Sequence, residues 1–175
     1  MVDSTTARSR TAPLVTAVVL GAIAVALFVV LLAVIRPDRT HHTTARGLTG
    51  TEQQAVDAAK QIVTNTLTYS RASFDKDYAR TLAGATGSLA SDLGKLKSQV
   101  LSQMNAGKFD LQGQVTAAAF EQSDGTNYLV LVSAQGFKLP DGGQRTLQSA
   151  PRFELTMVRT GGRWLANNLT YVGLI

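Results

Sequence analysis

The sequence predicts an α+β domain that follows a single N-terminal transmembrane helix. Three observations lead to this prediction: an uncharged apolar run near the N-terminus, apolar residues at helical spacing over 55–104, and strand-like patterns from residue 108 onward. Because helices and strands are segregated along the chain, we expect three helices packed on one face of a four-stranded antiparallel sheet.

The anchor prediction rests on residues 14–35, which form an uncharged apolar run. As a helix this run would be about 33 Å long, enough to cross a hydrocarbon core of about 30 Å. Pro13 suits the first turn, and Arg36-Pro37 ends the run with a charge and a helix breaker. A cleaved signal peptide would have a shorter apolar region and a small-x-small cleavage site. We therefore expect an uncleaved anchor.

The remaining segments complete the predicted organisation. Residues 1–13 form a short tail, residues 36–50 a polar juxtamembrane linker, and residues 51–175 the domain. The net charge of +5 is concentrated around the apolar run, where anionic headgroups would attract it. Arginines on the two sides of the run nearly balance, so charge alone does not set the orientation.

Small residues give the anchor a candidate packing surface. Ala17 and Gly21 are four residues apart, and Ala24 falls near the same helical face. Small side chains let another transmembrane helix approach closely, although Ala and Gly are also common in any membrane helix. The pattern is compatible with helix–helix packing and with ordinary membrane-helix composition.

Composition excludes several kinds of chemistry. The chain has no cysteine, which rules out disulfides, thiolate catalysis and Cys-type metal sites. Its two histidines, His41 and His42, lie in the linker, where we expect solvated side chains rather than a metal site. A domain without histidine cannot build a Ser-His-Asp triad, and no P-loop motif is present. Basic residues form no patch with aromatics, so we expect neither a cofactor nor a nucleic-acid partner.

The predicted helices follow from capping and periodicity. Thr49 and Glu52 form a capping-box pattern, and apolar residues then recur at helical spacing through about Ser70. A short second helix is expected from Asp75 to Leu82. A third is expected from Ser88 to about Asn105, with Gly107 just past its end.

Strands are predicted over the rest of the chain. They cover Phe109–Gln122, Tyr128–Phe137, Arg152–Arg159 and Trp164–Val172. Turns are expected at 123–126 and 160–163, and a loop at 139–145. Gly113 and Gly136 lie inside strands, where a bulge or bend would let the sheet curve. A curved sheet under helices suggests, by fold analogy alone, the cone-shaped nuclear-transport-factor-2-like or cystatin-like architecture.

Carboxylates are the remaining candidates for catalysis. Asp75 and Asp77 lie at the start of a short helix, where negative charge complements the helix dipole. Glu154 alternates with apolar residues and is expected to face water or to pair with an arginine on a neighbouring strand. Asp110 and Glu121 would have to point inward from a strand. The structural interpretation is favoured for all of them, and Trp164 is expected to be a core or rim residue.

Two groups of motifs carry a resemblance to a known family. The first is Leu67 to Ser70, Phe74 to Ala79 and Ala85-Thr86-Gly87; the second is Arg152 to Arg159, Gly162 to Leu165 and Leu169 to Val172. Because both groups follow one N-terminal anchor in this order, the chain resembles the Mce-associated membrane proteins of actinobacteria. The positions that carry the resemblance are Tyr69, Asp75, Asp77, Gly87, Arg152, Phe153, Met157 and Trp164.

The resemblance implies a single-pass protein of the cytoplasmic membrane whose domain lies outside the cytoplasm. It implies a non-catalytic accessory subunit of an Mce lipid-import system for fatty acids or sterols, energised by a separate ATPase. The implied partners are Mce pore and permease subunits and membrane lipid. The family offers no established catalytic residues to carry over, and the short tail 1–13 departs from its pattern.

Two further functions remain open from the sequence. The domain can be a lipid-binding module that holds an acyl chain in the cone between sheet and helices. Alternatively, it can be a scaffold subunit of a secretion system, because periplasmic domains of those machines share this fold and topology.

Overall fold

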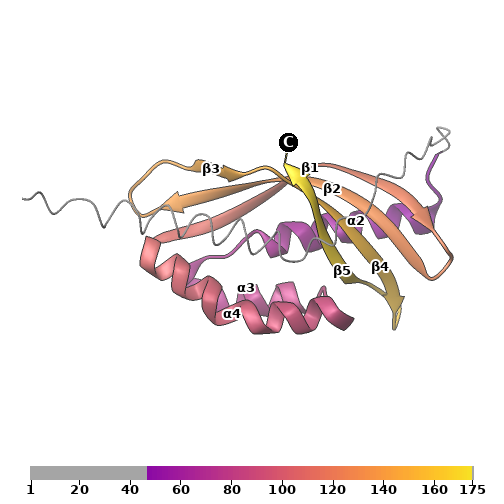
Figure 1. The fold of residues 1–175 in the computed structure, drawn as a ribbon, viewed down its shortest axis with the longest axis horizontal. Helices are drawn as coiled ribbons and strands as arrows, with labels where there is room; N and C mark the ends of the chain where they lie inside the picture. The colour runs from indigo at the N-terminus through magenta and orange to yellow at the C-terminus, as the bar shows by residue number, and fades with distance from the viewer. Residues whose placement is uncertain (1–46, 175) are drawn as a thin grey trace, which may run out of the picture. The chain divides into compact units, whose positions relative to one another are not determined.

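The computed structural model describes residues 47–174. The helices are α2 (Gly50–Thr66), the short 3-10 helix η1 (Arg71–Ser73), α3 (Phe74–Leu82) and α4 (Gly87–Gly107). The strands are β1 (Phe109–Ser123), β2 (Asn127–Pro140), β3 (Thr146–Ser149), β4 (Pro151–Thr160) and β5 (Arg163–Leu174). The α-helices lie on one side of an antiparallel sheet, as predicted for an α+β domain (Figure 1).

The predicted anchor, residues 14–35, lies outside the described residues. The same holds for its candidate packing residues Ala17, Gly21 and Ala24, and for the two linker histidines. Within residues 47–174, no helix is both long and apolar enough to span a bilayer.

Helix α2 begins at the predicted capping box and supplies much of the core. The Thr49 hydroxyl accepts from the Glu52 N–H at 3.3 Å, and the Thr49 N–H donates to the Glu52 carboxylate at 2.7 Å. This exchange satisfies two backbone N–H groups that a helix start otherwise leaves unpaired. The buried apolar side chains of the helix are Ala55, Val56, Ala59, Ile62 and Val63.

The end of α2 differs from the prediction. The helix stops at Thr66 rather than near Ser70. The Tyr69 N–H donates to the Leu111 carbonyl at 3.0 Å, and the Leu111 N–H donates to the Tyr69 carbonyl at 2.8 Å. Pairing with β1 therefore replaces the helical hydrogen bonds of this segment.

The end of α4 also differs from the prediction. Gly107 is the last helical residue rather than the first one beyond the helix, and Lys108 takes the left-handed conformation with a φ of 50°. A Cβ on Gly107 would lie 2.4 Å from the Phe109 ring. Glycine at position 107 therefore leaves room for the Phe109 ring. The left-handed conformation that ends the helix is adopted by Lys108.

The sheet has five strands rather than the predicted four. Its main order is β1-β2-β4-β5, in which the four predicted strands are neighbours in chain order. The additional strand, β3, pairs with β2. The N-terminal half of β2 pairs with β4 and its C-terminal end, 136–138, pairs with β3. The predicted loop 139–145 is shorter because β2 continues to Pro140.

The positions of the sheet irregularities correct one prediction. In β1 the register shifts lie between Val115 and Ala117 and between Phe120 and Gln122, and none lies at Gly113. Gly113 instead allows a close approach, because a Cβ there would lie 2.4 Å from the Leu67 Cβ. Gly136 does adjoin a shift, in the pairing of β2 with β3.

Alternation gives the sheet two different faces. The inner face carries the buried side chains Val130, Val132, Ala134, Phe153, Leu155, Met157 and Ala166, and α2 contacts β1, β2, β4 and β5. The outer face carries the alternate residues, including Leu129, Leu131, Glu154, Thr156 and Val158. The helices cover only the inner face (Figure 1).

Candidate functional site

The first group of motif residues forms a small aromatic core. The Tyr69 ring lies 5.6 Å from both Phe74 and Tyr78, and Phe74 lies 5.3 Å from Tyr78. Met104 of α4 is buried against them. Aromatic pairs at these distances add to the stabilisation from burial, so the motif joins the segment after α2, α3 and α4.

The hydroxyl groups of Tyr69 and Tyr78 both donate hydrogen bonds inside this core. The Tyr69 hydroxyl donates to Thr81 Oγ1 at 3.2 Å, and the Thr81 hydroxyl donates to the Asn65 carbonyl at 2.9 Å. The Tyr78 hydroxyl donates to the Leu93 carbonyl of α4. Burial raises the pKa of both tyrosines above the ordinary value, so both remain protonated donors at neutral pH.

Asp77 ties the start of α3 to the segment before it. Its carboxylate accepts from the Ser70 N–H at 3.0 Å and the Ser73 hydroxyl at 2.8 Å, and it pairs with Arg80 at 3.0 Å. Burial would raise the pKa of the Asp77 carboxyl, but these hydrogen bonds and the Arg80 charge outweigh it and lower the pKa. The carboxylate is therefore held in its charged form.

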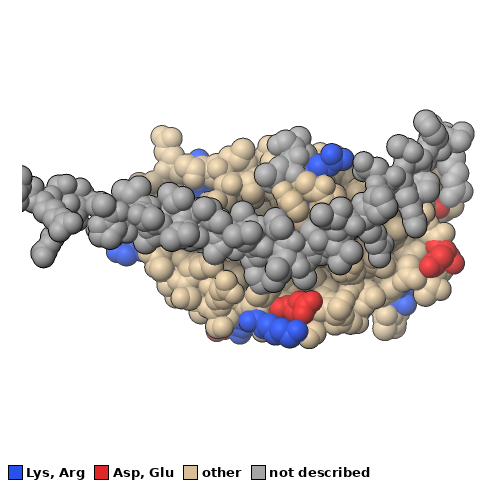
Figure 2. Space-filling model, in the orientation of Figure 1, with Lys and Arg blue, Asp and Glu red and all other residues tan. Residues whose placement is uncertain are grey.

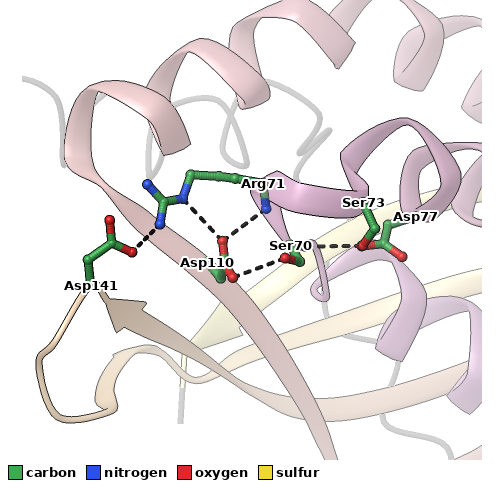
Figure 3. A network of polar contacts seen from close by, with 6 residues as sticks. All are labelled: Ser70, Arg71, Ser73, Asp77, Asp110 and Asp141. Carbon is green, nitrogen blue, oxygen red and sulfur yellow. Dashed lines mark hydrogen bonds and ion pairs between the residues drawn. The ribbon is translucent and has the colours of Figure 1, made fainter.

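Arg71 links this segment to the sheet (Figure 3). Its backbone N–H and its Nε donate to Asp110 Oδ1 at 2.9 and 3.2 Å, and the Ser70 hydroxyl donates to Asp110 Oδ2 at 3.1 Å. The guanidinium also pairs with Asp141, in the loop between β2 and β3. We call Ser70, Arg71, Asp110 and Asp141 the Arg71 clasp.

The charges of the clasp stabilise one another. Hydrogen bonds to Asp141 and Asp110 raise the pKa of Arg71. Burial would raise the pKa of the Asp110 carboxyl, but the hydrogen bonds from Arg71 and Ser70 lower it below its ordinary value. These groups bind one another rather than holding a proton ready for transfer, so the clasp fits a structural tie.

A surface pocket of about 420 Å³ adjoins the clasp. It is lined by residues 71–76 and by Leu101 of α4. Asp75 lies at its edge with 85% of its side chain exposed and pairs with Lys97 of α4 at 2.6 Å. The lining mixes charged and apolar side chains, unlike the largely apolar lining of most small-molecule sites.

The structure does not bring the candidate carboxylates together. Asp77 and Asp110 are engaged in separate ion pairs and Asp75 is on the surface. Glu121 lies at the second irregularity of β1, and Glu154 is half-buried on the outer face. Residues 47–174 contain no cluster of three or more acidic or histidine side chains suited to a metal ion. On the face in Figure 2, acidic and basic atoms are interspersed rather than gathered into a patch of one sign.

The second group of motif residues lies in the hairpin of β4 and β5. Phe153 and Met157 are buried on the inner face, whereas Arg152 is exposed on the outer face. Trp164 is half-buried with its ring edge-on to Tyr128 at 4.8 Å. Its Nε1 has no hydrogen-bond partner in the described part of the chain. This placement agrees with a core or rim residue.

Gly87 connects the two motif groups. It starts α4 with a φ of +55°, and a Cβ there would lie 1.9 Å from Asn167 Oδ1 of β5. Next to it, the Thr86 N–H donates to the Ala166 carbonyl and the Ala166 N–H donates to the Gly84 carbonyl, both at 2.9 Å. Only glycine fits this conformation and this approach without strain.

Fold and clasp together define a class: a small α+β domain whose helices cover one face of an antiparallel sheet and are tied to it by buried and charged groups. Within this class, the chain belongs to the family described as uncharacterized protein Rv1363c/MT1408-like, whose model matches residues 12–173. That description names no transport system, so the Mce association remains a prediction. No curated protein matches the chain.

Solved structures with the same fold include components of secretion systems. An IcmL-like type IV secretion system protein from Legionella pneumophila matches with a TM-score of 0.60 and 9% identity, covering 74% of this chain and 96% of that one. The periplasmic domain of DotI matches at 0.58 and 14%, covering 77% and 99%. Agrobacterium tumefaciens VirB8 matches at 0.58 and 9%, covering 75% and 99%. These identities show a shared fold alone.

Acid is expected to weaken the domain through Asp77 and Asp110. Because folding lowers the pKa of both carboxyls, their stabilisation is full above the unfolded pKa of about 3.9 and is lost as pH falls through the lower folded values. Melting temperatures should fall steeply below about pH 4. In an Asp110→Asn chain the fall should be shallower, and an equally steep fall would contradict this assignment.

Proposed function

We propose that this protein is a non-catalytic assembly subunit of a multi-protein complex in the cell envelope, anchored by residues 14–35 with its domain outside the cytoplasmic membrane. The observation that carries the proposal is the fold. It matches nearly the whole length of a domain named as periplasmic and of proteins named as secretion-system components. A predicted anchor directly before such a domain fits the same arrangement.

The use of polar groups within the domain supports a binding role rather than a catalytic one. Asp75, Asp77 and Asp110 each form an ion pair, and the hydroxyl groups of Tyr69 and Tyr78 donate inside the core. A catalytic acid or base needs a pKa near the working pH and a reachable substrate. Surfaces of the domain and the anchor are therefore the proposed means of action.

Between the two kinds of complex, we favour the scaffold of a secretion-type machine over the Mce accessory subunit, because proteins named as secretion-system components share the fold. The Mce alternative rests on the motif resemblance, whose residues Tyr69, Asp77, Phe153 and Met157 serve the core and the ties between elements. Such residues preserve a fold shared by many complexes and do not select a partner. Mce association is kept as the second candidate.

The lipid-binding alternative receives less support from the described residues. The inner face is filled by α2 and by the buried side chains of β2 and β4. The pocket of about 420 Å³ lies beside η1 and α3 rather than between sheet and helices. An acyl chain would need a deeper apolar site.

One purification tests these proposals. The full chain, tagged after Ile175 and extracted in mild detergent from native membranes, should bring down a set of envelope-complex subunits detectable by mass spectrometry. Secretion-channel components are the expected result, and Mce subunits would select the second candidate. Recovery of no envelope subunit above an untagged control would overturn the assembly role.

Topology is tested separately. A reporter active only outside the cytoplasm, fused after Ile175, should give signal, whereas one that needs the cytoplasm should not. The opposite pattern would place the domain on the wrong side for either kind of complex.

A further inference from the structure

The outer face of the sheet carries apolar side chains at its centre. Strand β2 is central and carries apolar residues on both faces, with Leu129 and Leu131 on the outer one. Ala117 and Ala119 of β1 flank them and are exposed, and Val158 of β4 is half-exposed. The solvent face of an antiparallel sheet is commonly polar, so apolar side chains at the centre of that face are unusual. In the described chain, the helices lie only on the inner face (Figure 1).

One pair of opposite charges interrupts this outer face. Arg152 and Glu154 are two residues apart on β4, so both point outward, about 7 Å from each other along the strand. They lie opposite Ser133 and Leu131 of β2. Arg152 is exposed and Glu154 is half-buried. Neither forms an ion pair or a side-chain hydrogen bond in the described chain, so both are available to a partner.

We propose that a second copy of this chain covers the outer face and forms a two-fold dimer in which Arg152 of each copy pairs with Glu154 of the other. In a two-fold interface, contact of residue i with residue j implies contact of j with i. An axis between these two positions therefore satisfies all four charges at once. The small side chains of Ala117 and Ala119 let two sheets pack face to face at about 10 Å.

Charge favours a second copy over other occupants. Besides Arg152 and Glu154, the outer face carries Arg145, which lies over the Phe137 ring toward the C-terminal end of β2. At the centre of the face there is one positive and one negative side chain, so two copies that meet there do not repel each other. A partner of a single charge would leave one of the two residues against a like charge, and a bilayer would leave both desolvated without a partner. This inference concerns self-association and does not depend on which envelope complex the chain serves.

Charge reversal tests the pairing. The full chain in lipid nanodiscs or mild detergent should be a dimer by light scattering. Arg152→Glu and Glu154→Arg should each weaken self-association about tenfold or more, because each turns two attractive contacts into like-charge contacts. The double variant R152E/E154R should restore the dimer, since the pair is then reversed on both sides.

Two controls separate this interface from other effects. Arg159→Glu makes the same charge change at an exposed site at the end of β4 and should leave the dimer intact. Repeating the series in a Gly21→Leu chain removes the candidate packing surface of the anchor. A monomeric wild type, single variants that dimerise normally, or a double variant that stays monomeric while remaining folded by circular dichroism would each overturn the proposal.

Discussion

Replacing Gly113 with alanine is expected to lower the free energy of unfolding by about 2–3 kcal/mol. The added Cβ would lie 2.4 Å from the Leu67 Cβ and 3.4 Å from its backbone. Relief would require moving the end of α2 away from β1, where the Gly113 N–H also donates to the Thr68 hydroxyl at 3.0 Å. Urea unfolding followed by circular dichroism measures the change.

Gly94 provides the matched control for this substitution. It lies inside α4, and apart from the adjacent backbone of its own helix nothing lies within 4 Å of its added Cβ. Gly94→Ala should therefore raise the free energy of unfolding by about 0.5–1 kcal/mol, because alanine favours a helix over glycine. If Gly113→Ala and Gly94→Ala changed the free energy of unfolding similarly, the close contact with Leu67 would not be what requires glycine at position 113.

Asp77→Ala is expected to lower the free energy of unfolding by about 2–4 kcal/mol. The change leaves the Ser70 N–H and the Ser73 hydroxyl without their acceptor and Arg80 without its partner. Thermal or urea unfolding at neutral pH measures the loss. The aromatic core beneath should loosen as well, because Tyr69 and Phe74 flank the segment that Asp77 fixes.

Asp75→Ala tests whether this effect belongs to the site or to the helix dipole. Both aspartates lie in the first turn of α3, but Asp75 has 85% of its side chain exposed. Its loss should change the free energy of unfolding by no more than about 0.5–1 kcal/mol. An equal loss in the two variants would assign the stabilisation to the dipole rather than to the Asp77 hydrogen bonds.

Much of the fold follows from local patterns. The capping box marks the start of α2, the helical period predicts α4, and alternation predicts β4. These signals depend on residues that are close in sequence, so they can be recognised in a single amino-acid sequence. The missed features depend on partners elsewhere: Tyr69 ends the helical segment by pairing with Leu111, and β3 is a strand because the end of β2 is available to it.

The candidate site shows the same division more sharply. The motif around Tyr69 and Asp77 is visible in the sequence, but the pairing of Arg71 with Asp110 and Asp141 is not. Arg71 binds Asp110 and Asp141, which lie 39 and 70 residues away in the chain. No spacing rule connects such positions. Only the tertiary fold, or correlated substitutions in related sequences, would link Asp141 to Arg71.

The hydrogen bonds of Ala166 with Gly84 and Thr86 form a parallel β-bridge between Ala85 and Ala166. This bridge affects when the domain can fold. The Ser88 hydroxyl, next to that bridge, donates to the carbonyl of Asn167, 79 residues further along the chain. A growing chain thus lacks the support for the start of α4 until the last strand has left the ribosome, and such distant contacts form slowly. On the proposed topology, the chain would cross the membrane before this contact forms, so the end of translocation, rather than of synthesis, would allow the domain to complete its folding.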